Sequence, residues 1–333
     1  MKKVTVLGDG GWGTALALVL LSNGHDVTLW GRQPEKIESL RKSRENKYLK
    51  GIVLPENLKL ESDPAAAVGE AEFAVLAAPS QYMRETLEKF SGFLDPEKCA
   101  VIDVAKGIEN GSLKRMSEVF EDIFGSSRNY TVLSGPSHAE EVAVNVPTAV
   151  VAASRDLCAA ETIQQLFMTP SFRVYTSDDI TGVELGGSLK NVLAIAAGIC
   201  DGMEMGDNTK AALMTRGIAE MARLGCALDG RKETFAGLSG VGDLIVTCMS
   251  RHSRNRFVGE SLGKGKPLEE IRREMNGSVA EGVRTALSAY QLAEKAGIET
   301  PLINAVYEVL YCSRSPKDAV YELMTRSAKQ ENL

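Results

Sequence analysis

The chain has 333 residues, with 38 Lys and Arg against 44 Asp and Glu, and it carries a formal net charge of −6. A hydrophobic fraction of 44% and a charged fraction of 25% are those of an ordinary folded protein, which excludes a disordered or fibrous chain. The acidic balance argues against a general nucleic-acid binder or a protein of anionic membrane surfaces, and the length favours two domains.

The first half of the chain has the pattern of alternating strands and helices. Short β-rich runs occur at residues 4–7, 27–30, 73–77, 100–104, 131–133 and 149–152, with helix-like segments between them. Several of these runs are apolar throughout, as strands buried on both faces of a sheet should be. The pattern predicts an α/β fold with an N-terminal Rossmann-type, doubly wound, mostly parallel sheet. The polar stretch at residues 43–50 suggests only a surface excursion.

The second half predicts helices almost alone. Apolar residues recur at helical spacing at 183–199, 211–224, 283–296 and 302–310. Before them, the Ser-Asp-Asp cluster at 177–179 is expected to end the last strand and cap the next helix. We therefore expect a dinucleotide-binding domain at residues 1–178 and an all-helical substrate-binding and catalytic domain at residues 179–333.

Location and metal content follow from weaker signals. We expect no integral membrane segment, because a bilayer requires about 20 apolar residues. The N-terminus does not have the features of a signal peptide, so we expect a cytoplasmic protein. The six cysteines and three histidines are widely spaced, which predicts reduced, mostly buried thiols and no metal site.

A glycine-rich turn follows the first predicted strand. Gly8-Asp9-Gly10-Gly11-Trp12-Gly13 is a G-x-G-x-x-G sequence that stands between this strand and an apolar helical run. In this context the first glycine permits the tight turn, the second lets backbone approach a pyrophosphate, and the third allows close helix packing. The helix N-terminus would offer its N–H groups to the phosphates. The turn predicts a dinucleotide cofactor.

Two basic residues follow later strands. Arg32 stands where NAD-specific proteins usually carry an acidic residue for the ribose 2′-hydroxyl. A guanidinium can pair with a 2′-phosphate instead, which favours NADP(H) while allowing NAD(H), and a solvated surface arginine is the alternative. Lys106 comes after the strand at 100–104, at the sheet edge where ligands bind, so ligand contact is preferred to a surface role.

The turn at Gly135 and Pro136 also follows a strand, and it is expected to aim backbone N–H groups into the same crevice. Ser137 and Glu140 have the spacing of a capping box, which is compatible with ligand contact. Residues 278–281 contain a second capping-box sequence that, taken alone, indicates only structure.

Glycines at 182, 186 and 187 precede Lys190 and Asn191 in an apolar helical run. Each costs about 1 kcal/mol relative to alanine, and close approach of a ligand or a neighbouring helix is the usual reason for such residues. Each polar side chain lies one turn after a glycine, which predicts a pocket. A partly desolvated lysine there can have its pKa lowered enough to exchange a proton. The alternative is a lysine that only extends from its helix into solvent.

Two polar clusters lie further along the chain. Asp243 and Thr247 set a carboxylate and a hydroxyl four residues apart, and Asp243 could hold Lys190 or a substrate hydroxyl. Three arginines and a capping serine then occupy 251–256, just before a helix-like segment. In an acidic chain they predict a local phosphate site, because arginine bonds phosphate bidentately and helix N-termini attract anions. A solvated basic turn is the alternative.

Over essentially its whole length the chain resembles the bacterial NAD(P)-dependent glycerol-3-phosphate dehydrogenases. The resemblance rests on these segments, in the family's order: GDGGWGTALA, VAKGIE, SGPSHAEEVA, ELGGSLKNVLAIAAGICDG, GDNTKAALMTRGIAEM, LSGVGDLIVTC, SRNRFVGESLGKG and VAEGVRTA. It implies a Rossmann domain followed by a helical substrate domain, with Lys190 as the acid/base residue. It also implies a homodimer and a role in supplying glycerol 3-phosphate for glycerophospholipid synthesis.

The resemblance further implies two sets of binding residues. With the glycine turn included, the cofactor set is Gly8, Gly10, Gly11, Trp12, Gly13, Arg32, Lys106, Ala139, Arg254, Val279 and Glu281. The set for sn-glycerol 3-phosphate or its ketone is Lys106, Gly135, Ser137, Lys190, Asp243, Ser253, Arg254 and Asn255, with Asn191 and Thr247 in support. His138 and the CDGMEM segment at 200–205 depart from the family pattern. These departures concern local packing and include no residue with a proposed catalytic role.

The resulting hypothesis is reversible hydride transfer between NAD(P)H and dihydroxyacetone phosphate, with protonated Lys190 donating to the developing alkoxide beside the nicotinamide. A β-hydroxyacid or 6-phosphogluconate type dehydrogenase is one alternative, although the SRNR segment and the LSGVGDL turn favour the triose phosphate. A non-catalytic NADP(H) sensor is another. A sensor would not require a lysine above paired glycines.

Overall fold

The computed structural model describes residues 1–275, 277–328 and 330–331, and the chain divides into two compact units. One unit contains Met1–Lys106 and Lys114–Ile180, and the other contains Gly107–Leu113 and Thr181–Leu333. The segment Gly107–Leu113, which the predicted first domain included, thus belongs to the helical unit. Its Ile108 lies in the helical core, and the Ser288 hydroxyl donates to the Ile108 carbonyl oxygen at 3.2 Å.

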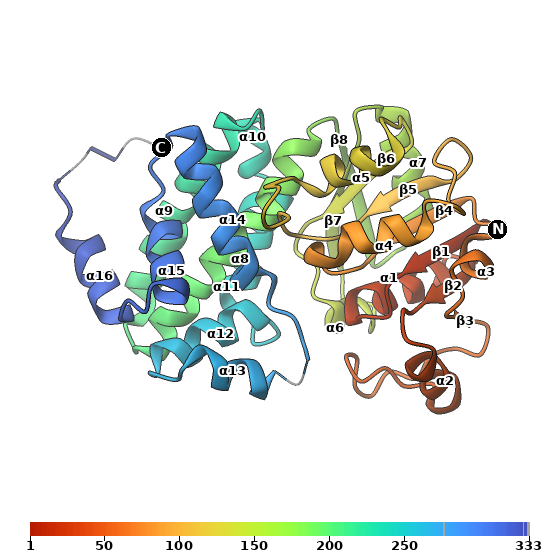
Figure 1. Cartoon of the computed structure of the whole chain (residues 1–333), viewed down its shortest axis with the longest axis horizontal. Helices are drawn as coiled ribbons and strands as arrows, with labels where there is room; N and C mark the ends of the chain where they lie inside the picture. The colour runs from red at the N-terminus through yellow and green to blue at the C-terminus, as the bar shows by residue number, and fades with distance from the viewer. Residues whose placement is uncertain (276, 329, 332–333) are drawn as a thin grey trace. The chain divides into compact units, whose positions relative to one another are not determined.

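The first unit is built on an eight-stranded sheet with the order β3-β2-β1-β4-β5-β6-β7-β8 (Figure 1). The strands are β1 (Lys3–Leu7), β2 (Asp26–Trp30), β3 (Lys59–Glu61), β4 (Phe73–Leu76), β5 (Ala100–Asp103), β6 (Tyr130–Ser134), β7 (Thr148–Ala153) and β8 (Phe172–Ser177). Only the pairing of β6 with β7 is antiparallel among these described strands. The prediction of a Rossmann-type, mostly parallel sheet is confirmed. All six expected strands are present, β3 and β8 complete the sheet, and β8 ends at the predicted serine.

Helices connect these strands in two groups. One group is α1 (Gly11–Ser22), which contacts both α6 (Ala139–Val142) and α7 (Leu157–Phe167). The other is α4 (Met83–Phe90), which contacts both α3 (Pro64–Val68) and α5 (Met116–Phe124), while α2 (Pro34–Ser43) contacts β3. The strand order reverses between β1 and β4, because the chain crosses from β3 to the other side of β1. Open α/β sheets bind ligands at the carboxyl ends of the strands beside such a point.

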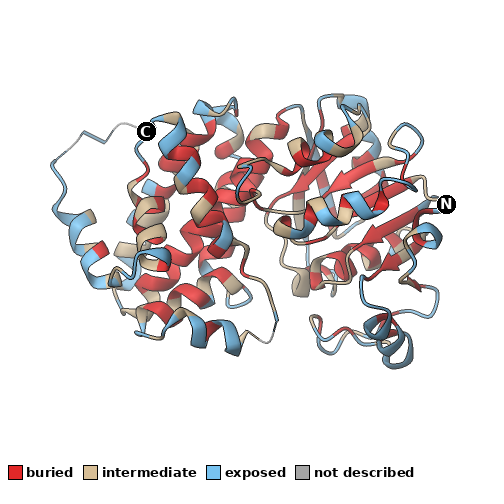
Figure 2. Ribbon diagram, in the orientation of Figure 1, coloured by how far each residue is buried: buried red, intermediate tan, exposed pale blue. Residues whose placement is uncertain are grey.

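The second unit surrounds one long helix, α8 (Ile180–Gly202), which is buried along almost its whole length (Figure 2). The other elements of this unit are α9 (Gly206–Ala227), α10 (Lys232–Phe235), a π-helical turn η2 (Leu238–Gly242), α11 (Asp243–Met249), α12 (Arg254–Gly263), α13 (Leu268–Glu274), α14 (Glu281–Ala296), α15 (Pro301–Tyr311) and α16 (Pro316–Thr325). This confirms the prediction of a helical second half. By length and apolar composition α8 could cross a membrane, but its apolar segment is wholly buried inside the unit, as in a core helix.

Helices α8 and α12 meet backbone to backbone, because glycines line their contact. A Cβ at Gly198 would lie 2.1 Å from the carbonyl oxygen of Arg256, and a Cβ at Gly259 would lie 1.9 Å from that of Ile195. The next turn of each helix repeats the arrangement, with Gly202 in α8 and Gly263 in α12. Residues four apart share one helix face, so each helix presents a continuous groove to the other. The contact holds the start of α12 in place beside α8.

Replacement of Gly259 by alanine is expected to destabilise the protein. The new methyl group would meet the Ile195 carbonyl oxygen at 1.9 Å, so the two helices must separate. We expect the free energy of unfolding to fall by about 2–3 kcal/mol, despite the roughly 1 kcal/mol that alanine gains in helix propensity. Urea denaturation followed by circular dichroism measures the change. Gly92→Ala is the control, since its methyl group would meet no described atom within 4 Å, and equal stability of the two variants would contradict the tight contact.

Candidate functional site

The glycine turn after β1 is shaped by its own backbone contacts. Gly8 has a φ of +141°, and a Cβ there would lie 2.6 Å from the Ala77 carbonyl oxygen. At Gly13 a Cβ would lie 2.2 Å from the carbonyl oxygen of Gly8. At Gly10, by contrast, a Cβ would find no described atom within 4 Å. The first and third glycines are therefore required by the turn itself, and the second leaves room for a ligand against the backbone.

Helix α1 begins at this turn with Gly10 as its N-cap residue. The first N–H groups of a helix lack intrahelical partners, and Thr14 N–H is bonded back to the Gly10 carbonyl oxygen at 3.0 Å. The indole Nε1 of Trp12 is buried and has no hydrogen-bond partner among the described residues. Donors at a helix N-terminus beside open space fit the pyrophosphate of a dinucleotide.

Asn46 holds the glycine turn and was missed by the sequence analysis. Its Nδ2 donates to the Asp9 carbonyl oxygen at 2.9 Å and to Thr14 Oγ1 at 2.7 Å, and its Oδ1 accepts from Tyr48 N–H at 3.0 Å. The interpretation of residues 43–50 as a surface excursion is therefore wrong at Asn46, which is buried. The one signal was Leu49, an apolar residue in a polar stretch, which is also buried.

Replacement of Asn46 by alanine is expected to weaken cofactor binding by roughly tenfold, because one buried amide fixes both ends of the turn. The Kd for NADPH, measured by fluorescence titration, tests this. Asn23→Ala removes a comparable bond at the other end of α1, from Nδ2 to the Leu166 carbonyl oxygen at 2.9 Å. We expect Asn23→Ala to lower stability with little change in cofactor Kd. Equal Kd changes in the two variants would reduce Asn46 to a general structural role.

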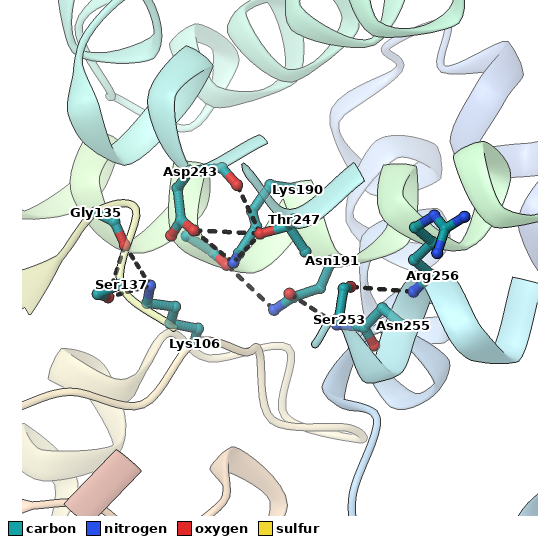
Figure 3. A network of polar contacts seen from close by, with 11 residues as sticks. Lys106, Gly135, Ser137, Lys190, Asn191, Asp243, Thr247, Ser253, Asn255 and Arg256 are labelled. Carbon is teal, nitrogen blue, oxygen red and sulfur yellow. Dashed lines mark hydrogen bonds and ion pairs between the residues drawn. The ribbon is translucent and has the colours of Figure 1, made fainter. Parts of the chain in front are cut away.

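Three further predicted residues of the first unit come together. Lys106 Nζ donates to the Gly135 carbonyl oxygen at 2.8 Å and lies 3.5 Å from Ser137 Oγ (Figure 3). Ser137 Oγ donates to the same carbonyl at 2.8 Å. The predicted capping box at Ser137 is wrong, because His138 is the N-cap residue of α6 and the serine hydroxyl turns back to Gly135.

The other two predicted cofactor residues of this unit occupy different surroundings. Ala139 starts α6 and packs beside the start of α1, since a Cβ at Gly11 would lie 3.8 Å from that of Ala139. Arg32 follows β2 and pairs with Glu85 at the start of α4, at 2.8 Å. Its guanidinium is therefore already engaged by a carboxylate.

In the helical unit Lys190 is buried and held from two sides. Its Nζ donates to Asp243 Oδ1 at 2.7 Å and to Thr247 Oγ1 at 2.7 Å (Figure 3). Lys190 is 6% exposed and Asp243 is 1% exposed, while the Thr247 hydroxyl also donates to the Asp243 carbonyl oxygen at 2.6 Å. The alternative of a lysine that extends into solvent is wrong. An ammonium and a carboxylate this deeply buried must be paired, and here they are.

Gly186 explains how Asp243 reaches the lysine. A Cβ at Gly186 would lie 2.6 Å from the Ser239 carbonyl oxygen, so α8 packs directly against η2, and η2 leads into Asp243 at the start of α11. The missing side chain makes room for backbone, and the predicted pocket above this glycine is filled by η2. One residue later, the carbonyl oxygen of Gly187 accepts a hydrogen bond from Asn191 Nδ2 at 3.2 Å.

The start of α12 is tied to α8 and α14 by asparagine side chains. Asn255 Nδ2 donates to Asn191 Oδ1 at 2.9 Å, and Asn255 Oδ1 accepts from Gly282 N–H at 2.9 Å. Ser253 caps α12 through a bond from Arg256 N–H to its Oγ at 3.1 Å, as predicted. Arg254 NH1 donates to the Val279 carbonyl oxygen at 3.3 Å, so these predicted residues form one polar cluster.

Two predictions at this end of the unit are wrong in part. Arg256 does not join a three-arginine phosphate site, because its Nε donates to Asp201 Oδ2 at 2.6 Å and that carboxylate also pairs with Lys210. The capping box at residues 278–281 is also absent from the described chain, since Ala280 is the N-cap residue of α14 and Glu281 is its first residue. Arg254 keeps its guanidinium within the polar cluster, through its bond to the Val279 carbonyl oxygen.

The cysteines offer no nucleophile at this cluster. Cys248 follows Thr247 in α11, and burial raises the pKa of its thiol to about 12. Burial likewise raises the pKa of Cys99 to about 12 and that of Cys200 to about 11. All six cysteines are free, but Cys158, Cys226 and Cys312 are exposed, so the expectation of mostly buried thiols holds for only half of them.

Comparisons with known proteins agree over both units. A model described as the N-terminus of NAD-dependent glycerol-3-phosphate dehydrogenase matches residues 3–160, and the corresponding C-terminus model matches residues 179–321. A curated glycerol-3-phosphate dehydrogenase (NAD(P)+) of Carboxydothermus hydrogenoformans is 51% identical over 331 residues, covering 99% of this chain and 98% of that protein. One of Lysinibacillus sphaericus is 51% identical over 334 residues, with 99% and 98% covered. The solved glycerol-3-phosphate dehydrogenase of Coxiella burnetii superposes with a TM-score of 0.93 at 38% identity, covering 98% of this chain and 99% of that chain.

Proposed function

Because this chain belongs to the NAD-dependent glycerol-3-phosphate dehydrogenase family, we propose that it interconverts dihydroxyacetone phosphate and sn-glycerol 3-phosphate with Lys190 as proton-transfer residue. It is an NAD(P)-dependent oxidoreductase that acts on a CH-OH group. The observation that carries the assignment of Lys190 is its buried ammonium, held at 2.7 Å by both Asp243 and Thr247.

Lys190 supplies the proton of the reduction. When bound, the cofactor supplies hydride to C2 of the ketone, and negative charge then develops on the C2 oxygen. The Lys190 ammonium donates a proton to that oxygen, and in the oxidation the amine takes it back. Asp243 stabilises the ammonium form and, with Thr247, fixes the position of Nζ, so that little reorganisation is needed during proton transfer.

The substrate phosphate is assigned to the start of α12. Arg254 provides a guanidinium that can bond two phosphate oxygens, and the first N–H groups of α12 add the positive end of a helix dipole. Asn255 and Asn191 hold this helix start against α8 through their mutual hydrogen bond. Binding energy from the phosphate, remote from the reacting carbon, would orient the carbonyl. The remaining substrate residues proposed are Lys106, Gly135, Ser137, Asp243, Thr247 and Ser253.

The cofactor is assigned to the glycine turn and the residues around it. The turn would bind the pyrophosphate through the N–H groups of α1, and Trp12, in the first turn of that helix, is proposed to contact the cofactor. Arg32 is proposed to face the adenosine ribose, with NADP(H) preferred to NAD(H). The remaining cofactor residues proposed are Lys106, Ala139, Arg254, Val279 and Glu281. We further propose that the protein is a cytoplasmic homodimer and that it supplies sn-glycerol 3-phosphate for glycerophospholipid synthesis.

NADPH absorbance followed after addition of dihydroxyacetone phosphate tests the proposed reaction. We expect one NADPH oxidised for each sn-glycerol 3-phosphate formed. A dehydrogenase of the β-hydroxyacid or 6-phosphogluconate type would instead turn over only with those substrates. A protein that binds NADPH tightly and oxidises it with none of these compounds would be a sensor, and the enzymatic assignment would fail.

A further inference from the structure

Arg32 and Glu85 form a two-pronged ion pair at the carboxyl edge of the sheet. Arg32 NH1 donates to Glu85 Oε2 at 3.0 Å, and NH2 lies 2.8 Å from Glu85 Oε1. Each terminal guanidinium nitrogen thus contacts one carboxylate oxygen. This bidentate geometry is the one in which arginine binds a carboxylate or a phosphate most strongly. The two side chains are 55% and 57% exposed, so solvent and ligands can reach the pair.

The pair bridges the two sides of the glycine turn. Arg32 follows β2 and Glu85 lies in the first turn of α4, which follows β4, and these two strands flank β1. The dinucleotide-binding turn leaves β1 between them. In this fold the residue after β2 faces the adenosine ribose, and an arginine there accommodates a 2′-phosphate. The 2′-phosphate of NADP(H) and the carboxylate of Glu85 would therefore compete for hydrogen bonds from the same guanidinium nitrogens.

Other charges lie close to the pair. The glycine before Arg32 is tight against Asp9, since a Cβ at Gly31 would lie 3.0 Å from the Asp9 carboxyl carbon. Lys89, one turn after Glu85 in α4, places its Nζ 5.7 Å from the ring centroid of Trp30. Glu85 is the carboxylate that is bonded to the Arg32 guanidinium among the described ion pairs. It is therefore the residue best placed to control what else that guanidinium binds.

We propose that Glu85 sets the balance between NADP(H) and NAD(H) by competing with the 2′-phosphate for Arg32. An exposed ion pair contributes little free energy, so a phosphate can displace the carboxylate, but it must then remain near a like charge. NAD(H) carries a 2′-hydroxyl, which leaves the pair intact. Glu85 thus lowers the affinity for NADP(H) selectively. This inference rests on the proposed function, because it takes the dinucleotide site of that function as its starting point.

Glu85→Gln tests the proposal, because it removes the charge and keeps the shape of the side chain. Isothermal titration of NADP+ and NAD+ gives the two dissociation constants without turnover. We expect the ratio of NAD+ Kd to NADP+ Kd to rise by roughly five- to tenfold, through tighter NADP+ binding. Adenosine 2′-monophosphate, which carries only the discriminating end of the cofactor, should gain affinity by a similar factor.

Glu88→Gln is the matched control, since it removes the same charge from an exposed position on the same helix. It should leave the Kd ratio within about twofold of the wild type. In an Arg32→Ala background the gain from Glu85→Gln should shrink, because its target is gone. Three results would overturn the proposal: an equal gain in affinity for NAD+ in Glu85→Gln, an equal gain in NADP+ affinity in Glu88→Gln, or an undiminished gain in NADP+ affinity when Arg32 is replaced. If the wild-type protein does not reduce dihydroxyacetone phosphate, the proposed function is refuted. The dissociation constants for NADP+ and NAD+ would still test the role of Glu85, because they are measured without turnover.

Discussion

Lys190→Ala is expected to lower kcat for dihydroxyacetone phosphate reduction by about 10³- to 10⁴-fold. The variant removes the proton donor for the developing alkoxide, and general acid catalysis by a positioned side chain contributes a factor of this order. Steady-state oxidation of NADPH at saturating ketone measures the change. A kcat within tenfold of the wild type would show that another group carries the proton.

The control for this variant is the cofactor. Because Lys190 is not among the proposed cofactor residues, and the glycine turn and Arg32 belong to the sheet-containing unit, the Kd for NADPH should stay within a few-fold of the wild type. A large rise in this Kd would mean that the substitution has disturbed the fold beyond its site. Stability should also fall, because the carboxylate of Asp243, which is 1% exposed, loses its charged partner.

Arg254→Ala is expected to raise the KM for dihydroxyacetone phosphate by roughly 10- to 100-fold, since hydrogen bonds to charged groups contribute about 1.5–3 kcal/mol. The change in kcat should be smaller. Unphosphorylated dihydroxyacetone provides the sharper readout, because it lacks the group that Arg254 is proposed to bind. The preference for the phosphorylated ketone should shrink by the same factor.

Arg251→Ala is the matched control, as an exposed arginine three residues earlier in the same segment. Its KM should stay within about threefold of the wild type, as for removal of a screened surface charge. An unchanged KM in Arg254→Ala, or an equal rise in both variants, would remove the phosphate role from Arg254.

Local rules explain which features could be predicted from the sequence. The glycine turn depends on contacts within a few residues and with one neighbouring strand, so its spacing and position were enough to identify it. Lys190 was singled out as a candidate residue because glycines inside a helix are costly, so those one turn earlier indicated a close contact at this point. The reason proved to be backbone packing at Gly186 against Ser239, which brings Asp243 to the lysine. The contact between Lys190 and Asp243 was therefore anticipated as one of two alternatives, whereas the backbone packing that produces it was not.

Pairings between distant residues could not be predicted in the same way. Asn46 reaches a turn 32 to 37 residues earlier in the chain, and Arg32 meets a carboxylate 53 residues later. The sequence pattern placed Arg256 in a phosphate cluster, but its guanidinium pairs with Asp201, 55 residues earlier in the chain. In each case the partner is chosen by tertiary packing, which the spacing of residues along the chain does not encode.

The two capping boxes failed for a related reason. A serine three residues before a glutamate satisfies the pattern, but the pattern does not determine where the helix begins. The helices start at Ala139 and Glu281, so the residue before each of them is the N-cap instead of the serine. Ser137 gains a nearer acceptor, the Gly135 carbonyl oxygen. That bond places the serine beside Lys106, where it is proposed to contact substrate.

The double variant Lys190→Ala/Asp243→Asn tests the central claim most directly, because it removes the proton donor without leaving an unpaired buried charge. In a single turnover with NADPH bound, we expect it to remain folded, to bind cofactor like the wild type and to form sn-glycerol 3-phosphate at least 10³-fold more slowly. Product formation at a rate close to that of the wild type would contradict the assignment of proton transfer to Lys190.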